Sequence, residues 1–222
     1  MTAVRGPKAG LAAEIMARIA ALGSPATPAL RVLRRSFSQR LASAPRRRIL
    51  DLAGTLARAG YPSVGFELVR FHPEALGLLT AREVEALGRG LDSWGAVDCF
   101  GVLVAGPAWR RGRLTDNRIH RWARSPDRWR RRAALVSTVA LNSAADAGLV
   151  DARRTLAVCR RLAGDRDPLV VKALSWALRQ LAKRDPGAVR AYLAADGDLL
   201  AAQVRREVRN KLETGRKQPR RP

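Results

Sequence analysis

Apolar residues along this chain recur at the spacing of helices rather than of strands. The stretch from 171 to 181 is an example, because its large apolar residues fall at intervals of three and four and so share one side of a helix. They are Val171, Leu174, Leu178 and Leu181. Alternating patterns and β-branched clusters, which are typical of strands, are sparse. The pattern predicts an all-α protein with roughly twelve helices of about 8–18 residues, joined by short loops.

Polar residues indicate where several of these helices begin. In Ser125-Pro126-Asp127, Asp167-Pro168 and Asp185-Pro186, a residue that can cap a helix stands before a proline suited to the first helical position. Thr80 and Glu83 have the spacing of a capping box. Asp151 is expected to open a further helix.

Two of these starts resemble each other at an offset of 40 residues. Asp127 and Asp167 are each followed five residues on by a cation, Arg132 or Lys172, and then by Ala. A period near 40 in an all-helical chain is typical of HEAT-like helical pairs, which stack into a superhelical solenoid. We therefore expect one repeat domain over 10–214, with Arg132 and Lys172 on the same concave surface. Residues 1–9 and the basic, Pro-rich residues 215–222 are expected to be disordered.

The chain is strongly basic. It has 42 Lys and Arg against 19 Asp and Glu, a formal net charge of +23. Residues 108–134 contain ten Arg and two Asp, interleaved with Trp109, Trp122 and Trp129. A Trp-bearing cationic segment inside a folded chain is typical of a nucleic-acid contact. A membrane surface is the rival partner, but no long helix combines a basic face with a bulky apolar one.

Other classes of protein have little support in the composition. Cys99 and Cys159 lie in apolar helical runs and are expected to be buried thiols. With His72 and His120 and no CxxC motif, we expect no metal site and no cofactor. No run approaches the roughly 18 uncharged apolar residues of a spanning helix, and residues 10–22 do not form a signal peptide. We expect a soluble, cytoplasmic, nucleoid-associated monomer.

One predicted helix places an aromatic residue among cations. Lys172, Trp176, Arg179 and Lys183 are spaced so that they share a face opposite the apolar one. A large ring there suits a groove in which it meets a sugar or base between phosphates. The alternative is a Trp at a helix–helix seam that keeps only its polar edge in water. This stretch alone leaves both interpretations open.

A second aromatic residue stands one turn before a carboxylate. Trp94 and Asp98 are four residues apart on a predicted helix and so share a face. An Asp in the middle of a helix is disfavoured by propensity and is costly if buried without a partner. It is therefore a candidate for chemistry. The alternative is an Asp that serves only as an ion-pair partner in a basic protein.

Together these motifs resemble a known family. The runs are Trp94-x-x-x-Asp98, Trp129-Arg-Arg-Arg132-Ala-Ala and Lys172-Ala-x-x-Trp176-x-Leu-Arg179. They are similar to those of the AlkD-type DNA alkylation repair proteins, which are glycosylases built from HEAT-like repeats. The resemblance covers residues 25–210 and is most specific in the C-terminal two-thirds. It implies double-stranded DNA carrying alkylated purines as the partner.

The resemblance also implies roles for individual residues. Asp98 corresponds to the catalytic carboxylate, and Trp94 and Trp176 to the two indoles that flank the deoxyribose of the lesion. Arg132 corresponds to the Arg that grips the DNA backbone near the lesion, although Arg130 and Arg131 of the same run are alternatives. The expected DNA-binding set is completed by Arg179, Lys172, Arg128, Arg131 and Lys183.

These residue types suit the excision of cationic bases. A purine alkylated at N3 or N7 carries a positive charge, so it leaves as a neutral base without protonation. The reaction needs a carboxylate and π faces that stabilise an oxocarbenium-like sugar. We therefore expect a monofunctional DNA glycosylase. The alternatives are a non-catalytic DNA-binding paralogue on the same scaffold, or a glycosylase specialised for bulky adducts. The clustered arginines argue against a third class, a protein-interaction scaffold.

Overall fold

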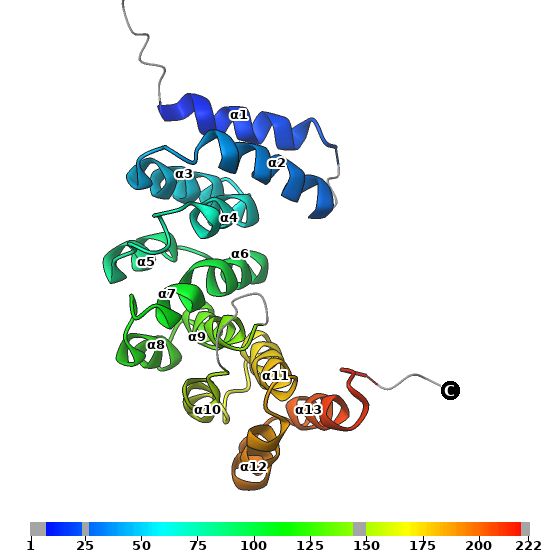
Figure 1. The fold of residues 1–222 in the computed structure, drawn as a ribbon. Coiled ribbons are helices and arrows are strands. Elements are labelled where there is room, and N and C mark those ends of the chain that lie inside the picture. The colour runs from blue at the N-terminus through cyan, green and yellow to red at the C-terminus, as the bar shows by residue number, and fades with distance from the viewer. Residues whose placement is uncertain (1–7, 24–26, 144–149, 219–222) are drawn as a thin grey trace, which may run out of the picture. The chain divides into compact units, whose positions relative to one another are not determined.

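The computed structural model describes residues 8–23, 27–143 and 150–218 (Figure 1). Every regular element in these ranges is a helix, which confirms the predicted all-α class. Contacts divide the chain into two compact units, Met1–Arg89 and Gly90–Pro222. The expectation of a single domain over 10–214 stays a prediction. Of the termini expected to be disordered, 1–7 and 219–222 lie outside the described residues.

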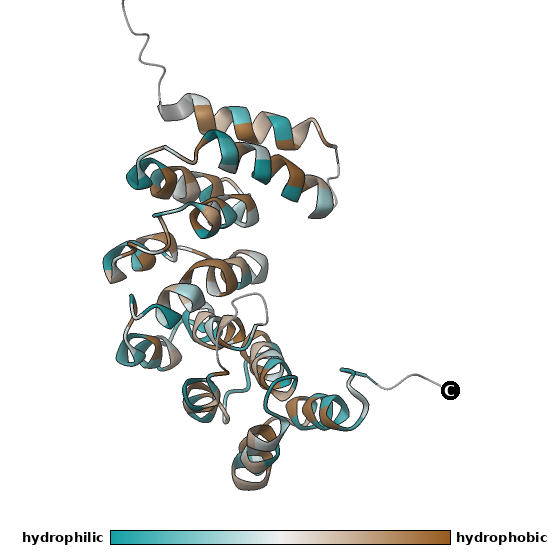
Figure 2. Cartoon of the chain, viewed as in Figure 1, coloured by the Kyte–Doolittle hydropathy of each residue, from teal (hydrophilic) through white to brown (hydrophobic). Residues whose placement is uncertain are grey.

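Unit 1 is built from helices that pack in neighbouring pairs. They are α1 (Lys8–Ala20), α2 (Thr27–Arg40), α3 (Arg46–Arg58), α4 (Pro62–Phe71) and α5 (Ala81–Leu87). Helix α3 packs against α1, α4 and α5, and α4 also packs against α2. The core includes Phe37, Leu56 and Phe66, all of them buried. Each helix has an apolar side and a polar side (Figure 2), so most charged side chains lie outside, with Arg34 an exception that is buried against Glu67.

Unit 2 stacks its helices around α9. The elements are α6 (Trp94–Phe100), a π-helix (Gly101–Ala105), α7 (Gly106–Arg110), α8 (Asp116–Ala123), α9 (Arg128–Leu141), α10 (Ala152–Arg161), α11 (Pro168–Ala182), α12 (Pro186–Asp196), a 3-10 helix (Gly197–Leu199) and α13 (Ala202–Thr214). Helix α9 packs against α6, the π-helix, α7, α8, α10 and α11, while α11 also packs against α12 and α13. Residues 132–141 of α9 are therefore all buried.

The predicted helix starts are confirmed at most positions. Thr80 and Glu83 form both hydrogen bonds of a capping box. Asp151, Asp167 and Asp185 each cap a helix by accepting a backbone N–H of its first turn. The prediction for 125–127 is wrong in one detail, because Asp127 itself is the cap and the proline lies before it. The Ser125 hydroxyl instead accepts from the backbone N–H of Asp127 at 3.2 Å, within the turn that precedes the helix.

The resemblance between the starts of α9 and α11 extends to their geometry. The carboxylate of Asp127 accepts from the backbone N–H of Trp129 at 2.9 Å, and that of Asp167 accepts from Leu169 at 2.8 Å. The cations five residues further on nevertheless differ. Arg132 is buried and Lys172 is exposed. Of the two cations expected on one surface, only Lys172 reaches solvent, because Arg132 has a partner inside unit 2.

The described part of the C-terminal tail turns back on the last helix. Gly215 follows α13 with a positive φ of 71°, a left-handed conformation that glycine adopts without strain. The side chain of Asn210 then donates to the Lys217 carbonyl at 3.3 Å. The Lys217 ammonium lies 3.4 Å from the carboxylate of Glu207. Residues 215–218 thus run alongside α13 rather than leading away from it.

Candidate active site

Helix α6 carries both Trp94 and Asp98. Ser93 caps the helix, and its hydroxyl accepts from the backbone N–H of Ala96 at 3.3 Å. Trp94 is the first helical residue and is 65% exposed, although large aromatic residues usually bury most of their surface. Asp98 follows one turn later, and its side chain is 17% exposed. The exposed ring and the recessed carboxylate therefore share one face of α6, as the sequence predicts.

Asp98 is held by the guanidinium of Arg132. Arg132 Nε donates to Asp98 Oδ1 at 2.8 Å, and Nη2 donates to Oδ2 at 2.7 Å. Its Nη1 donates to the backbone carbonyl of Leu169, in the first turn of α11. The Arg132 side chain is only 7% exposed. A bidentate, charge-assisted pair of this kind fixes the plane of the carboxylate and joins α6, α9 and α11 at one point.

The held carboxylate keeps capacity for a further partner. Each oxygen of an ionised Asp has two lone pairs, and Arg132 uses one on each oxygen. The remaining lone pairs and the partial exposure of Asp98 leave it able to accept a proton or face a cation. The geometry therefore allows an oriented carboxylate beside an exposed indole, which is a suitable arrangement for stabilising developing positive charge.

Two glycines let α6 and its continuation approach α9 closely. A Cβ added to Gly101 would lie 2.7 Å from Cγ1 of Val136, and one added to Gly106 would lie 2.6 Å from Cβ of Ala140. Gly101 begins the π-helix, three residues after Asp98. Single π-helical turns within longer helices occur frequently at functional sites. The contact between Asp98 and Arg132 thus lies one turn from a backbone approach that only glycine permits.

Helix α11 presents the second predicted group. Lys172 and Lys183 are exposed and Trp176 is half-buried, while the apolar side formed by Val171, Leu174, Leu178 and Leu181 is buried as predicted. The Lys183 ammonium donates to the side chain of Gln180 at 3.0 Å. Lys172 and Trp176 lie one turn apart, so a ligand that touches one can reach the other.

Arg179 is largely engaged inside the protein. Its Nε donates to the Ser175 hydroxyl at 3.1 Å and lies 3.7 Å from the carboxylate of Glu207 on α13. Burial lowers the pKa of Arg179, and the charge of Glu207 opposes that effect. The Ser175 hydroxyl also donates to Glu207. Arg179 therefore joins α11 to α13, and its predicted contact with the DNA backbone stays a prediction.

The four arginines at the start of α9 have four different environments. Arg128 is exposed and lies 3.7 Å from Asp167. Arg130 lies over the ring of Trp122, 5.6 Å from its centroid. Arg131 donates to Asp165 at 2.7 Å and to the backbone carbonyls of residues 125 and 126. Arg132 holds Asp98. Within this run, Arg128 is the side chain best placed in solvent.

Comparison with families of known proteins assigns the chain. The model of the DNA alkylation repair enzyme family matches residues 17–212. The chain belongs to this family. The matched range includes Trp94, Asp98, Arg132 and Trp176. Neither the search of curated proteins nor the search of solved structures found a match.

Within 8–23, 27–143 and 150–218, no three His, Cys, Asp or Glu side chains gather where they could hold a metal ion. The same residues form no helix that is long and apolar enough to cross a bilayer. Cys159 is buried as predicted, and burial raises the pKa of its thiol. Cys99 is only half-buried, because α6 presents it at the edge of its packed face.

Several residues around the site were not predicted from the sequence of this family member. The contact with the backbone carbonyl of Leu169 could not be predicted, because every residue has a carbonyl and no side chain marks this one. Gly101 and Gly106, separated by four apolar residues, could have indicated a close helix contact. Glu207 is buried, and a single carboxylate in a basic chain gives no indication of its partner. The polar network around Arg179 was therefore missed.

Proposed function

We propose that this chain is a DNA glycosylase that excises purines alkylated at N3 or N7 by hydrolysis of the N-glycosidic bond. The observation that carries the proposal is Asp98, a recessed carboxylate held by the fork of Arg132, one turn from the exposed ring of Trp94. Membership of the DNA alkylation repair enzyme family supports a substrate in alkylated DNA.

Asp98 is suited to the step in which the glycosidic bond breaks. As that bond breaks, its electron pair returns to the purine nitrogen and cancels the positive charge of the alkylated base. The sugar becomes an oxocarbenium-like cation, which a fixed carboxylate stabilises. The oxygen of a water molecule then bonds to the anomeric carbon, and its surplus proton passes to Asp98 or to solvent. A neutral base would need a general acid, so neutral lesions should be poor substrates.

Trp94 and Trp176 are proposed to flank the sugar of the lesion. The exposure of Trp94 supports this role, because packing within unit 2 covers little of its ring. Trp176 is half-buried and has Lys172 one turn before it on α11. An indole face favours nearby positive charge, and Trp is the best side chain for this purpose. The pair would therefore strengthen the effect of Asp98 without any proton transfer.

The contact with the DNA backbone is proposed for the cations that remain in solvent. Lys172, Lys183 and Arg128 are exposed, which suits contacts with phosphates. Arg131 and Arg179 are hydrogen-bonded within the protein and would stabilise the scaffold instead. Arg132 is proposed first to orient Asp98. Its contact with the DNA backbone, which the resemblance implies, stays a prediction, because its side chain is only 7% exposed and is hydrogen-bonded within the protein.

We further propose that the helices form HEAT-like repeats of a superhelical solenoid with a concave basic surface. The matching caps of α9 and α11, 40 residues apart, support this assignment. So does the packing of successive helices against each other in each unit. Such repeats place equivalent side chains of neighbouring helices in a row, which suits contacts along one DNA strand.

The test is single-turnover release of 7-methylguanine from a defined duplex. Wild type is compared with Asp98→Asn and with Asp165→Asn, a matched variant of another recessed Asp that an Arg holds at 2.7 Å. We expect Asp98→Asn to lower the rate by about 100-fold or more while duplex binding is retained. Asp165→Asn should change the rate of the folded enzyme little. Equal losses in both variants would contradict a catalytic role for Asp98.

A second function is favoured by one observation. The bidentate contact with Arg132 neutralises Asp98, as it would in a protein that uses the pair only for stability. The corresponding function is DNA binding on the same scaffold without turnover. In the same experiment, tight binding without release by wild type from duplexes carrying 7-methylguanine, 3-methyladenine or a bulky adduct would support this second function.

A further inference from the structure

Helices α8 and α10 carry a second group of arginines away from the candidate site. We define the α8–α10 surface by Arg121, Arg124, Arg153 and Arg161, which are all exposed. The two helices pack against each other, and both pack against α9. They bury their apolar sides, which include Ile119, Trp122, Leu156 and Val158. The arginines therefore project on the side turned away from α9.

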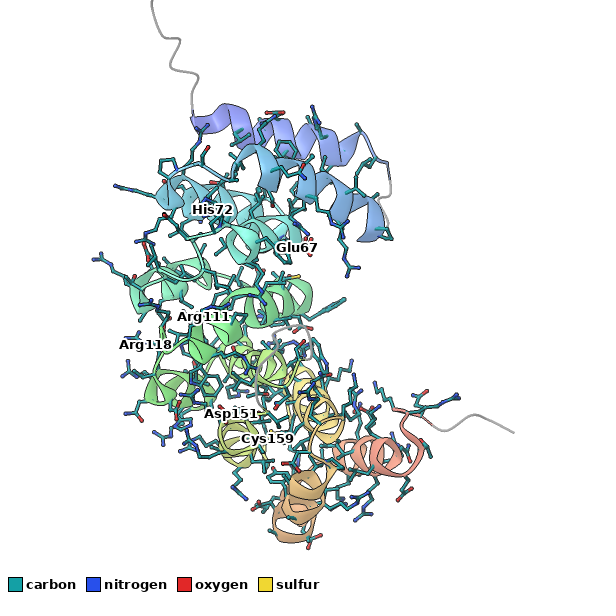
Figure 3. The ribbon with its side chains drawn as sticks, viewed as in Figure 1. Glu67, His72, Arg111, Arg118, Asp151 and Cys159 are labelled. Atoms are coloured by element: carbon teal, nitrogen blue, oxygen red, sulfur yellow. The ribbon has the colours of Figure 1, made fainter. Side chains whose placement is uncertain are left out.

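Figure 3 shows this side of unit 2 with many nitrogen-tipped side chains. Arg118 is labelled beside α8, and Asp151 is labelled at the start of α10. In Figure 1, α8 and α10 lie side by side along the left edge of unit 2, whereas α9 lies to the right of α8 and α11 to the right of α10. Asp98 and Arg132 belong to the contact between α6 and α9. The α8–α10 surface is thus separate from the candidate active site.

The arginines of this surface come from both helices and converge. Asp116 on α8 accepts from Arg154 at 2.8 Å and from Arg153 at 3.5 Å, which fixes the two helix starts together. Further along, His120 lies among the cations. Burial lowers the pKa of its imidazole, and the nearby charges of Arg161, Arg124 and Arg153 lower it further against the attraction of Asp116. Positive charge from both helices therefore surrounds His120.

Acidic residues do not balance this positive charge. Asp116 and Asp151 are the only acidic residues within 116–124 and 151–161, and both pair with Arg154. Among the described residues, no carboxylate pairs with Arg121, Arg124 or Arg161. Arg161 instead donates to a backbone carbonyl of its own helix at 2.7 Å. Arg121, Arg124 and Arg161 are exposed cations without carboxylate partners in the described part of the chain and repel one another, so an anionic ligand would relieve the repulsion.

The composition of the surface indicates which ligand fits. Arginine forks match phosphate oxygens better than a lysine point charge does, and the surface contains no lysine. The large exposed apolar side chains of the described residues lie elsewhere, so the surface offers no anchor for a membrane or for a protein hot spot. Arg153 and Arg161 are eight residues apart on α10, about 12 Å along the helix. Over that length, one DNA strand presents about three to four phosphates.

We propose that the α8–α10 surface binds the backbone of a second DNA segment while the lesion-bearing duplex occupies the region of Asp98. The proposal rests on the proposed function, because that function brings DNA to the protein. Binding at this surface is independent of sequence and depends on salt. It would let one molecule hold two DNA segments and pass between them during its search for damage.

The experiment measures whether one protein molecule bridges two duplexes. Full-length protein is mixed with a biotinylated and a fluorescent undamaged 24-base-pair duplex, and capture on streptavidin reports bridging. The test variant is Arg121→Gln/Arg124→Gln/Arg161→Gln. The control is Arg184→Gln/Arg190→Gln/Arg209→Gln, which removes the same charge from other exposed positions of unit 2. We expect bridging by wild type and by the control, and a loss of about tenfold or more in the test variant.

The same proteins are assayed for release of 7-methylguanine from one short duplex at saturating enzyme. We expect the test variant to retain the wild-type rate, because none of its three residues lies in the candidate site. Wild type that fails to bridge, a test variant that bridges normally, or a control that loses bridging equally would each overturn the proposal. Failure of excision with bridging that depends on the surface would overturn the proposed function instead. Capture that RNA abolishes at a much lower concentration than unlabelled DNA does would assign the surface to RNA and also overturn the proposal.

Discussion

Arg131 and Arg132 are neighbours on α9, and each holds an aspartate at 2.7 Å, yet the two pairs have different surroundings. Arg131 also donates to the carbonyls of Ser125 and Pro126, and Asp165 accepts from the backbone N–H of Asp167 at 2.9 Å. That pair therefore joins two loops and is surrounded by backbone. Asp98 instead lies in the middle of a helix, one turn from an exposed indole.

An ion pair alone therefore does not identify a functional site. Both pairs are recessed and short, so burial and distance do not distinguish them. They differ in what else can reach the carboxylate. Asp165 accepts a backbone hydrogen bond within its own loop, whereas Asp98 lies one helical turn from Trp94, whose side chain the protein leaves exposed. The first pair suits a structural role and the second suits contact with a ligand.

The largest expected effect is on excision when the fork that orients Asp98 is lost. Arg132→Lys keeps a positive charge but cannot hold both carboxylate oxygens in one plane. We expect the single-turnover rate per folded enzyme to fall by about 100-fold, since small misplacements of a reacting group have effects of that size. Arg131→Lys is the matched change in the neighbouring pair.

The free energy of unfolding shows whether either variant loses activity only because less of the protein is folded. Replacing either Arg with Lys should lower the free energy of unfolding by about 1–3 kcal/mol, because the cation is kept but charge-assisted hydrogen bonds are lost. Urea denaturation measures this change. Only Arg132→Lys should also slow excision by the folded fraction. Similar excision rates in both variants would show that the Arg132–Asp98 pair is no more important for excision than the Arg131–Asp165 pair.

A smaller effect is expected from the close approach that places Asp98 against α9. In Gly101→Ala, the new methyl group would meet Val136 at 2.7 Å, so the π-helix and α6 must shift. We expect a loss of about 1–3 kcal/mol in the free energy of unfolding, together with slower excision by the folded enzyme. Chemical denaturation and single-turnover kinetics on the same samples measure both quantities.

Gly95→Ala is the control for this change, because it lies in the same helix and its added Cβ would meet nothing within 4 Å. Alanine should stabilise α6 there by about 0.5–1 kcal/mol, since glycine is a poor helix former. If Gly101→Ala excised normally, the position of Asp98 would not depend on the glycine contact. The exposed ring of Trp94 would then be the remaining difference between the surroundings of Asp98 and those of Asp165.

The fold could be predicted from the sequence to the level of its elements. Helical spacing of apolar residues identified the class, and short-range chemistry identified caps such as Thr80 and Asp167. These signals depend on residues that are close in the sequence, so they can be detected without a structure. The π-helix at Gly101 could not be predicted, because it depends on how closely α9 approaches. The error at Pro126 is a local one, because Ser125 and Asp127 are both capping residues and Asp127 is the one that caps α9.

The candidate site could be predicted only in part. Spacing places Trp94 and Asp98 on one helix face, but their catalytic roles came from the resemblance to a family and stay predictions. The bond from Arg132 to Asp98 spans 34 residues, and no local pattern indicates which of four nearby arginines forms it. Arg179 shows the reverse case. It belongs to a cationic helix face by spacing, but Glu207 on another helix draws it into the protein.

The smallest expected effect concerns this third pair, Arg179 and Glu207, which should behave like Arg131 and Asp165. Burial alone would raise the pKa of Glu207, but hydrogen bonds from Ser175 and Gln203 and the charge of Lys217 lower it overall. A carboxyl whose pKa is lower in the folded state stabilises the protein above its unfolded pKa. That contribution is lost as the pH falls through the folded pKa.

Glu207→Gln should therefore destabilise the protein by about 1 kcal/mol at pH 7, and by progressively less as the pH is lowered from 6 towards 3. Urea denaturation across that range measures the difference from wild type. Asp198→Asn is the control, because Asp198 is fully exposed and an exposed pair contributes little. Excision at pH 7 should be unchanged in Glu207→Gln, since the partners of the Glu207 carboxylate, like those of Asp165, all lie within the protein. A large loss of excision at unchanged stability would instead show that Arg179 and Glu207 contribute to the reaction, as Asp98 is proposed to do.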